Sequence, residues 1–337
     1  MMKYELAPGY SISRVIKGHW QLAAGHLSQG SLDRQQLIRD MQAFANADIT
    51  TFDVADIYTG AEEMIGDFIR QSGAAVQVHT KYVPDMGLLS TVSEKDTRTI
   101  VERSLKRLGV ERLDLVQFHW WDYSVPRYIE VAHHLRTLQR EGKIRHIGVT
   151  NFNTQKLAEL VDSGLDIVSV QTQYSVLDRR PEKSLAAYCL EHGIAMLCYG
   201  TLAGGFLSSK FLDHPLSAKN RSHVKYRAVI EDIGGEEKFQ ELLRVMNGVA
   251  QRHGADISDI ATAYVLSKQG VGAAIVGAYH QEHLARLLRL NSLRLSAEDI
   301  SAIESVKLRA LEGDAFDLER DAPRHRELMK VNLNSGS

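Results

Sequence analysis

The chain has 337 residues, of which 44% are hydrophobic and 24% charged, an ordinary composition for a globular protein with a large core. The formal net charge is only -2, so no strong overall field favours nucleic acid or an acidic membrane surface as a partner. Small molecules are the expected partners.

Eight short apolar or β-branched runs follow one another along the chain, and each precedes a longer segment with apolar residues at three- and four-residue spacing. The predicted strands are 15–21, 49–53, 76–81, 113–119, 144–150, 167–173, 195–199 and 273–277. The segment after the second strand is a clear helix, in which Thr59 and Glu62 are spaced as a capping box. Its predicted apolar stripe is Ala61, Met64, Ile65, Phe68 and Ile69.

Eight strand–helix units predict a (β/α)8 TIM barrel, a fold that usually takes about 250 residues. We assign the surplus to an N-terminal cap segment, the stretch 208–235, an extra helix near 238–252 and the tail after residue 295. The whole chain is expected to be one barrel domain, with a core over about 12–310 and a C-terminal tail over 311–337. A doubly wound sheet is the alternative, but no G-x-G-x-x-G motif follows any predicted strand.

Polar residues recur at every second position of several predicted strands. In one of them Gln77, His79 and Lys81 share one face while Val76 and Val78 share the other. Thr51 and Asp53, Gln117 and His119, and Ser169 and Gln171 follow the same alternation. We predict that this polar face points to the barrel axis, where each group needs a partner because an unpaired buried amide or hydroxyl costs about 1–3 kcal/mol.

Three of these polar residues end successive strands, and a tyrosine follows one of them closely. Asp53, Lys81 and His119 are the strand-end residues, and Tyr58 lies in the loop after Asp53. In a barrel the carboxyl ends of the strands face the active site, so these side chains should meet there.

Together, such a set can reduce a carbonyl group. A neighbouring ammonium such as Lys81 is expected to lower the pKa of the Tyr58 phenol and make it a usable acid. Asp53 supplies the counterion for Lys81, and His119 can hydrogen-bond the carbonyl oxygen while a reduced nicotinamide supplies hydride.

Each of these residues taken singly fits a structural role better, as a loop cap, a strand-end charge, a core histidine or a packing tyrosine. Their joint placement favours function. A mononuclear metal site built from His79, His119 and Asp53 is the alternative chemistry. We rank it lower and expect no metal, because Lys81 on the same face opposes a cation and no H-x-H, H-E-x-x-H or C-x-x-C motif is present.

At this point the sequence strongly resembles the aldo-keto reductase family. The matching pieces, in family order, are "FDVADIYTGAEEMIGDFI", "HTKY", "LDLVQFHW", "GKIRHIGVTNFN", "VQTQYS", "CYGTLAGGFL" and "AAIVGA" followed by "HLARLL". The resemblance implies a catalytic tetrad of Asp53, Tyr58, Lys81 and His119, with Tyr58 as the proton donor. It implies an NAD(P)H-dependent oxidoreductase that reduces aldehydes or ketones to alcohols, reversibly.

The resemblance also implies where the cofactor lies. Thr150, which stands where the family usually has Ser, would hold the nicotinamide carboxamide with Asn151 and Gln171, and Tyr199 would stack on the ring. The segment 200–204 resembles the pyrophosphate loop, in which small residues let backbone N–H groups approach phosphate. The stretch 208–235 resembles the cofactor-covering loop, with a disordered loop as the alternative. The expected cofactor contacts are Trp20, Asp53, Thr150, Asn151, Gln171, Tyr199, Gly200, Thr201, Leu202, Gly204, Val276, Gly277, Ala278, Tyr279, Gln281 and His283.

The sequence departs from the family after the eighth strand. Family members commonly place Lys or Arg there for the adenosine 2'-phosphate, whereas here the positions read Gly277, Ala278, Tyr279 and His283. Backbone amides at a helix start can still hold phosphate. NADP(H) is favoured over NAD(H), and Arg286 or Arg289 could compensate, although both fit a solvated helix face better.

Aromatic residues beside the tetrad predict the substrate pocket. Trp20 follows the first strand and Trp120 follows His119, at positions where family members place pocket aromatics. Tyr82 is a further pocket residue, with Val83 a weaker candidate, whereas Trp121 is expected to pack under a loop. An apolar wall of this kind suits aldehydes and ketones with an aromatic or aliphatic body.

Cysteine usage and the ends of the chain predict the compartment. Two cysteines, Cys189 and Cys198, are too few for a disulfide framework, and no secretory signal or membrane span is apparent, so a cytoplasmic protein is expected. We expect a small-molecule carbonyl or alcohol substrate and no nucleic-acid or membrane partner, with a monomer slightly favoured. The alternatives are a nicotinamide-binding regulatory or redox-sensing subunit on the same fold and, third, a metal hydrolase.

Overall fold

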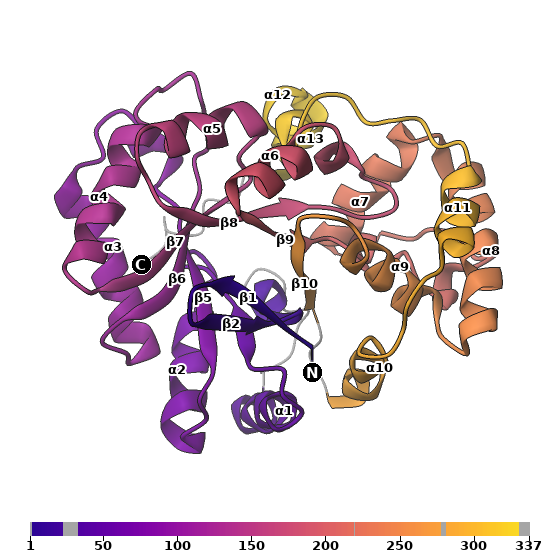
Figure 1. The fold of residues 1–337 in the computed structure, drawn as a ribbon, viewed down its shortest axis with the longest axis horizontal. Helices are drawn as coiled ribbons and strands as arrows, with labels where there is room; N and C mark the ends of the chain where they lie inside the picture. The colour runs from indigo at the N-terminus through magenta and orange to yellow at the C-terminus, as the bar shows by residue number, and fades with distance from the viewer. Residues whose placement is uncertain (1, 23–32, 219, 278–280, 330–337) are drawn as a thin grey trace.

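A closed barrel of eight parallel strands forms the centre of the molecule (Figure 1). The computed structural model describes residues 2–22, 33–218, 220–277 and 281–329. The strands are paired in the circular order β10-β3-β4-β5-β6-β7-β8-β9. Their bounds are β3 Val15–Gly18, β4 Thr51–Asp53, β5 Gln77–Tyr82, β6 Leu113–Phe118, β7 Ile144–Thr150, β8 Ile167–Gln173, β9 Ala195–Tyr199 and β10 Val271–Gly277. The predicted TIM barrel is confirmed. The first strand is shorter than predicted because residues Trp20–Leu22 form a 3-10 turn, η1.

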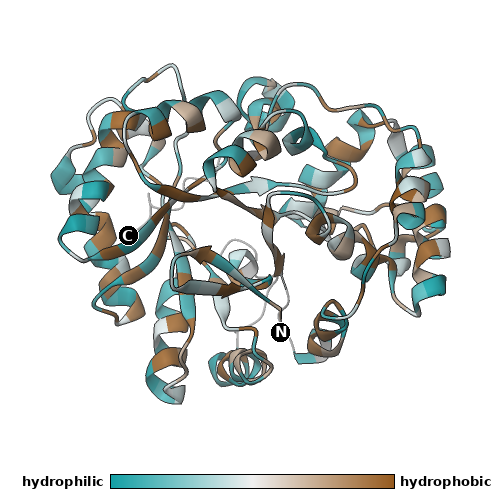
Figure 2. Ribbon diagram, in the orientation of Figure 1, coloured by the Kyte–Doolittle hydropathy of each residue, from teal (hydrophilic) through white to brown (hydrophobic). Residues whose placement is uncertain are grey.

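Helices surround the barrel, and their apolar positions gather on the sides that face the strands (Figures 1 and 2). Three helices, α7, α8 and α9, lie between β9 and β10, where a plain barrel has one, so part of the surplus length is here. Their bounds are α1 Arg34–Asn46, α2 Ala61–Ser72, α3 Glu94–Leu108, α4 Tyr128–Arg140, α5 Thr154–Asp162, α6 Leu185–His192, α7 Arg221–Asp232, α8 Gly235–His253, α9 Ile257–Leu266, α10 Leu284–Arg289, α11 Ala297–Ser305, α12 Asp317–Asp321 and α13 Pro323–Met329. Short 3-10 turns are η3 Met86–Leu88, η4 Arg180–Glu182, η5 Ala203–Gly205, η6 Ser209–Phe211 and η7 Gln281–His283. Within the described ranges, none of the helices has the length and apolar character needed to cross a membrane.

Helix α2 begins differently from the prediction. Its N-cap is Gly60, in the left-handed conformation with φ of 80°, and no side chain caps the helix. The carboxylate of Glu62 instead accepts a hydrogen bond from Thr80 Oγ1 at 2.7 Å. The predicted capping box is therefore wrong, because the buried carboxylate of Glu62 has a partner on β5. The predicted apolar stripe is confirmed, with four of its five residues buried and Ile69 partly buried.

The N-terminal cap segment is a β-hairpin of β1 (Lys3–Ala7) and β2 (Tyr10–Ser13), which the sequence reading did not assign to strands. Its apolar side chains pack with residues of the barrel interior, among them Leu115 and Leu197. The hydroxyl of Tyr10 lies 3.1 Å from His79 Nε2, and its ring lies 4.8 Å from that of His146. Both histidines are early in their strands, so the hairpin closes the end of the barrel opposite the carboxyl ends.

The predicted polar face does point to the barrel axis. Side chains from three alternate strands, β4, β6 and β8, meet in one layer, as the interior of this fold requires. Asp53 Oδ2 accepts hydrogen bonds from Gln117 Nε2 at 3.1 Å and from Gln171 Nε2 at 2.6 Å. Gln171 Nε2 also lies 2.9 Å from Gln117 Oε1. These polar groups therefore satisfy one another across the axis, directly beneath the carboxyl ends of the strands.

Candidate active site

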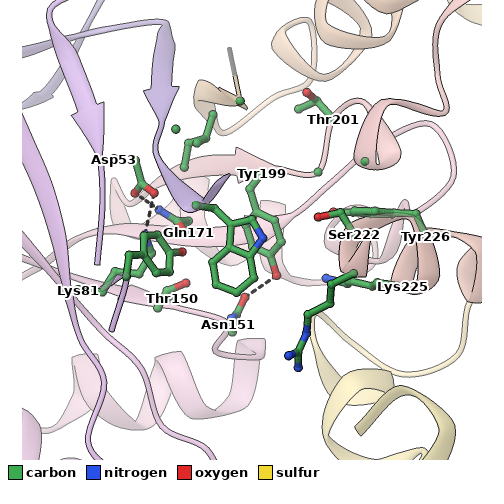
Figure 3. A pocket seen from close by; sticks show the side chains of 18 of the residues that line it. Asp53, Lys81, Thr150, Asn151, Gln171, Tyr199, Thr201, Ser222, Lys225 and Tyr226 are labelled. Carbon is green, nitrogen blue, oxygen red and sulfur yellow. Dashed lines mark hydrogen bonds and ion pairs between the residues drawn. The ribbon is translucent and has the colours of Figure 1, made fainter. Parts of the chain in front are cut away.

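A cavity of about 320 Å³ lies at the carboxyl ends of the barrel strands (Figure 3). Its walls come from strand ends, from the turn after β9, from α7 and from the C-terminal tail. The four residues of the expected tetrad, Asp53, Tyr58, Lys81 and His119, all line it. Four side chains that are up to 66 positions apart in the sequence, from Asp53 to His119, thus share one space.

Asp53 and Lys81 form a buried ion pair at the base of this cavity. Lys81 Nζ lies 2.7 Å from Asp53 Oδ1, and both side chains are 6% exposed. The same ammonium donates to the Val54 carbonyl oxygen at 2.9 Å. With Gln117 and Gln171 as further donors, the Asp53 carboxylate has three hydrogen-bond partners, so it is held rigidly at the strand end.

Tyr58 lies above this ion pair and is half-buried. Lys81 Nζ is 5.1 Å from the centroid of its ring, and the rings of Tyr58 and Trp20 meet edge-to-face with centroids 4.9 Å apart. Burial is the main cause that raises the pKa of Tyr58 well above its ordinary value, followed by the negative charges of Asp53 and Asp56. The sequence predicted a lowered pKa from Lys81. That prediction is wrong for the free site, because burial and the charges of Asp53 and Asp56 shift the pKa of Tyr58 in the opposite direction.

His119 is neutral in this site. Its Nδ1 lies 3.3 Å from the Thr150 carbonyl oxygen, which can only accept, so Nδ1 is the donor of that contact. Burial and then the Arg320 guanidinium lower the pKa of His119 to about 3. The ring packs edge-on against Trp121, with centroids 4.4 Å apart. These contacts leave Nε2 for the cavity.

The residues expected to hold the nicotinamide carboxamide, and Tyr199, expected to stack on its ring, lie beside the tetrad. Thr150, Asn151, Gln171 and Tyr199 all line the cavity, and the Tyr199 hydroxyl donates to Asn151 Oδ1 at 2.8 Å (Figure 3). Because Gln171 uses its Nε2 on Asp53 and Gln117, its carbonyl oxygen is left as an acceptor. A free amide acceptor and the Thr150 hydroxyl, in the same cavity as the tetrad, suit a carboxamide.

The turn after β9 fits the expected pyrophosphate loop. Gly200, Thr201, Leu202 and Gly204 line the cavity. Gly200 has a φ of 75°, and a Cβ atom there would lie 2.2 Å from the Tyr226 hydroxyl, so only glycine allows this approach. Thr201 Oγ1 is buried without a hydrogen-bond partner, which is the state expected of a group that binds a ligand.

The end of β10 completes the cavity but brings no cation. Val276 and Gly277 line the cavity, whereas Gln281 and His283, in η7, do not. The predicted contacts Ala278 and Tyr279 lie outside the described residues. Neither candidate for compensation lines the cavity: Arg286 donates to Ser258 Oγ at 2.6 Å and Arg289 pairs with Asp259 at 2.9 Å.

Of the residues predicted for the substrate pocket beyond Trp20, Trp120 and Tyr82 lie elsewhere, whereas the weaker candidate Val83 lines the cavity. Trp120 is fully buried and donates to the carbonyl oxygens of Asp122 and Val125, and Tyr82 is buried with its hydroxyl 2.9 Å from Thr97 Oγ1. The residues that line the cavity are their neighbours Trp121 and Val83. Successive side chains of an extended segment point to opposite sides. Because Lys81 and His119 point to the axis, Tyr82 and Trp120 point outward, and Val83 and Trp121 point to the axis again.

Two parts of the cavity wall were missed by the sequence reading. Helix α7, inside the expected cofactor-covering stretch, contributes Arg221, Ser222, Lys225 and Tyr226. Lys225 Nζ lies 5.3 Å from the centroid of the Tyr199 ring. The C-terminal tail contributes Phe316 and Leu328. The basic residues at 221 and 225, one helical turn apart, could have indicated that α7 faces an anionic cofactor. The sequence of the C-terminal tail has no comparable pattern.

The described residues contain no group of three or more His, Cys, Asp or Glu side chains arranged to hold a metal ion. Of the three ligands considered for such a site, His79 is separated from the other two. It pairs with Tyr10 below the polar layer and does not line the cavity.

Comparison with known proteins agrees with the geometry. Residues 14–308 match the model of the aldo/keto reductase family. The aldo-keto reductase YhdN of Bacillus subtilis is 28% identical over 336 residues, which cover 95% of this chain and 97% of that protein. The NADH-specific methylglyoxal reductase of Escherichia coli is 28% identical over 320 residues, covering 88% and 95%. The crystal structure of the thermostable aldo-keto reductase Tm1743 with the inhibitor epalrestat superposes with a TM-score of 0.72 at 26% identity, covering 91% of this chain and all of that one.

The family match spans most of the chain, and the barrel and the motif order agree with it. The chain is therefore an oxidoreductase of the aldo/keto reductase family.

Proposed function

We propose that this enzyme reduces an aldehyde or ketone to the alcohol with a nicotinamide dinucleotide, and that Tyr58 supplies the proton. One observation carries the proposal: the phenol, the ion pair, the histidine and the carboxamide-binding set line one cavity at the carboxyl ends of the strands. Relatives named as reductases support the same chemistry.

When bound, the reduced nicotinamide supplies a hydride to the carbonyl carbon. The π electron pair of the C=O bond then moves to oxygen, which takes the proton of the Tyr58 hydroxyl. A raised pKa keeps this phenol protonated in the free site, and a developing alkoxide is basic enough to take its proton. The Lys81 ammonium, 5.1 Å from the ring, stabilises the phenolate that is left.

His119 recognises the reacting oxygen in both directions of the reaction. A neutral imidazole carries one hydrogen, and in the free site it lies on Nδ1, toward Thr150. An alcohol can then donate its hydroxyl hydrogen to Nε2. A carbonyl substrate requires the other tautomer, with the hydrogen on Nε2. The 3.3 Å contact is long enough to be given up cheaply.

The cavity fits a nicotinamide dinucleotide: Gln171 and Tyr199 lie beside the tetrad, and the partnerless Thr201 hydroxyl lies in the turn after β9. The expected preference for NADP(H) has no support in the described part of the β10 end. Neither Lys nor Arg stands there to bind the adenosine 2'-phosphate. One relative is named NADH-specific. Both forms of the cofactor therefore belong in the test.

The test is a fluorescence titration with NADPH and NADH, followed by multiple-turnover assays with aliphatic and aromatic aldehydes and ketones. We expect saturable binding of at least one cofactor and sustained oxidation of that cofactor by some of the carbonyl compounds. Tight cofactor binding with a single slow turnover for every compound would contradict the proposal and favour the regulatory alternative.

Exchange of the two adjacent tryptophans tests which one meets substrate. Trp121→Ala is expected to raise KM for aromatic carbonyls about tenfold, because it removes an apolar wall from the cavity, with a smaller loss of stability than Trp120→Ala because Trp121 is only partly buried. Trp120→Ala should instead lower the stability by about 3–5 kcal/mol, because Trp120 is fully buried. A larger KM effect in Trp120→Phe than in Trp121→Phe, measured at a temperature where both fold, would contradict this assignment.

A further inference from the structure

Arg320, in the C-terminal helix α12, joins the two strand ends that hold His119. Its Nη2 donates to the carbonyl oxygens of Trp120 and Asn151, each at 2.8 Å. Trp120 directly follows His119 on the end of β6. Asn151 directly follows Thr150, whose carbonyl oxygen accepts the hydrogen bond from His119 Nδ1. One guanidinium thus holds both Trp120 and Asn151, the residues that follow His119 and Thr150.

The guanidinium is itself held firmly in place. It lies 3.9 Å from the centroid of the Tyr123 ring and 5.3 Å from that of Phe316, and Arg320 is only 9% exposed. Phe316 lines the cavity and faces the His119 ring edge-on at 6.1 Å. Asn151 has a φ of 62°, an uncommon value for a residue other than glycine, so its backbone needs a partner that holds it there.

The charge of Arg320 forms no direct ion pair in the part of the chain that the structure describes. The carboxylates of Asp317, Glu319 and Asp321 act on it only from beyond ion-pair distance, and its Nε and Nη1 are buried without hydrogen-bond partners. An unpaired buried cation lowers stability, and an apolar side chain would pack this position at lower cost. A positive charge retained at such a site points to a role beyond packing.

We propose that Arg320 is a positioning residue of the reaction: its hydrogen bonds to the ends of β6 and β7 fix the place of the His119 ring in the cavity, and its guanidinium charge acts on that ring. The inference rests on the proposed function, in which neutral His119 recognises the substrate oxygen.

The other groups that face His119 leave this role to Arg320. Lys81, from β5, is the second cation, but Asp53 of β4 balances it at 2.7 Å. Tyr58, from the loop after β4, shares the cavity. Burial and then Arg320 are the leading causes of the lowered pKa of His119. Removal of the Arg320 charge should therefore raise the pKa of His119 toward its ordinary value, so that protonation begins at a higher pH.

The test compares Arg320→Gln, which has donors but no charge, with Arg320→Lys, which keeps the charge. Arg324→Met is the matched control, since Arg324 lies in the same tail but bonds to α7, at Ala228 O and Glu231. Imidazole nitrogen NMR of the full chain follows the tautomer and titration of His119, whose signal is identified by its loss in His119→Asn. Parallel assays give kcat, KM and cofactor affinity against pH.

Arg320→Gln is expected to raise the pH at which His119 titrates by about one unit or more and to lower kcat about tenfold at acid pH, with cofactor affinity nearly unchanged. Arg320→Lys should titrate near the wild type with a smaller loss of kcat, and Arg324→Met should match the wild type. A wild-type titration in Arg320→Gln overturns the inference. If that variant does not fold, wild-type kcat and tautomer in Arg320→Lys overturn it. Wild-type protein with no turnover of any carbonyl overturns the proposed function instead, and the NMR comparison still decides the effect of Arg320.

Discussion

Replacing Tyr58 by Phe is expected to lower kcat for carbonyl reduction by about a thousandfold, within the range of roughly 10²–10⁴ that general acid catalysis contributes. The substitution removes only the hydroxyl. The ring keeps its contacts with Trp20 and with the Lys81 ammonium, so the cavity keeps its shape. Cofactor affinity from the fluorescence titration should remain close to that of the wild type, which separates a lost proton donor from a damaged site.

Tyr82→Phe is the matched control, because it deletes the same group from a buried tyrosine that does not line the cavity. Loss of its hydrogen bond to Thr97 should cost about 1 kcal/mol of stability and leave kcat unchanged. Single-turnover measurements with saturating cofactor show whether the hydride-transfer step itself has slowed. Tyr58→Phe with more than a tenth of the wild-type rate would mean that another group, or water, delivers the proton.

Alternation along the strands allowed the interior of the barrel to be predicted. The residues at 77, 79 and 81 and at 117 and 119 were assigned to one face from period-two polarity alone, and the hydrogen bonds of Gln117 and Gln171 to Asp53 show that face at the axis. The same alternation, continued past His119, would have predicted Trp121 instead of Trp120 as the tryptophan of the substrate pocket. The error came from reading the position next to His119 by family likeness instead of by parity.

Other features depended on long-range contacts that no local pattern reports. Glu62 accepts a hydrogen bond from Thr80 on β5 and therefore does not form the local capping box. Phe316 and Leu328 reach the cavity because the tail is tied across the barrel, where Glu319 accepts two hydrogen bonds of 2.9 Å from Arg180. This buried ion pair joins residues 139 positions apart, and no motif or local pattern in the sequence marks either Arg180 or Glu319 as buried.

The pKa of Tyr58 was mispredicted for a related reason. A lysine beside a phenol produces a lowered phenol pKa only where its effect exceeds the opposing effects of burial and of nearby carboxylates. In the structure the Lys81 charge is shared with Asp53 and the Val54 carbonyl oxygen, while burial and two carboxylates act on Tyr58 in the opposite direction. The ion pair therefore has two roles to separate, stabilising the barrel and assisting proton transfer.

Lys81→Met separates them. The substitution leaves the Asp53 carboxylate buried without its cation, so the free energy of unfolding in urea is expected to fall by about 3–5 kcal/mol, less whatever Gln117 and Gln171 retain by hydrogen bonding. Carbonyl reduction should fall as well, by about 10²-fold or more, because no positive charge remains to stabilise the Tyr58 phenolate. Lys156→Met, which breaks a more exposed pair with Glu159 at 2.7 Å, should cost only about 0–1 kcal/mol.

The double variant Asp53→Asn with Lys81→Met decides between the two roles, because it removes both charges and leaves neither buried alone. Its stability should recover much of the loss, giving a large coupling energy in the double-mutant cycle with the two single variants. Its kcat should not recover, because the cation near Tyr58 is still absent. If activity returned together with stability, Lys81 would act only by balancing Asp53, and the phenolate would have to be stabilised by another group in the cavity, with the Lys225 ammonium of α7 as the cation to examine next.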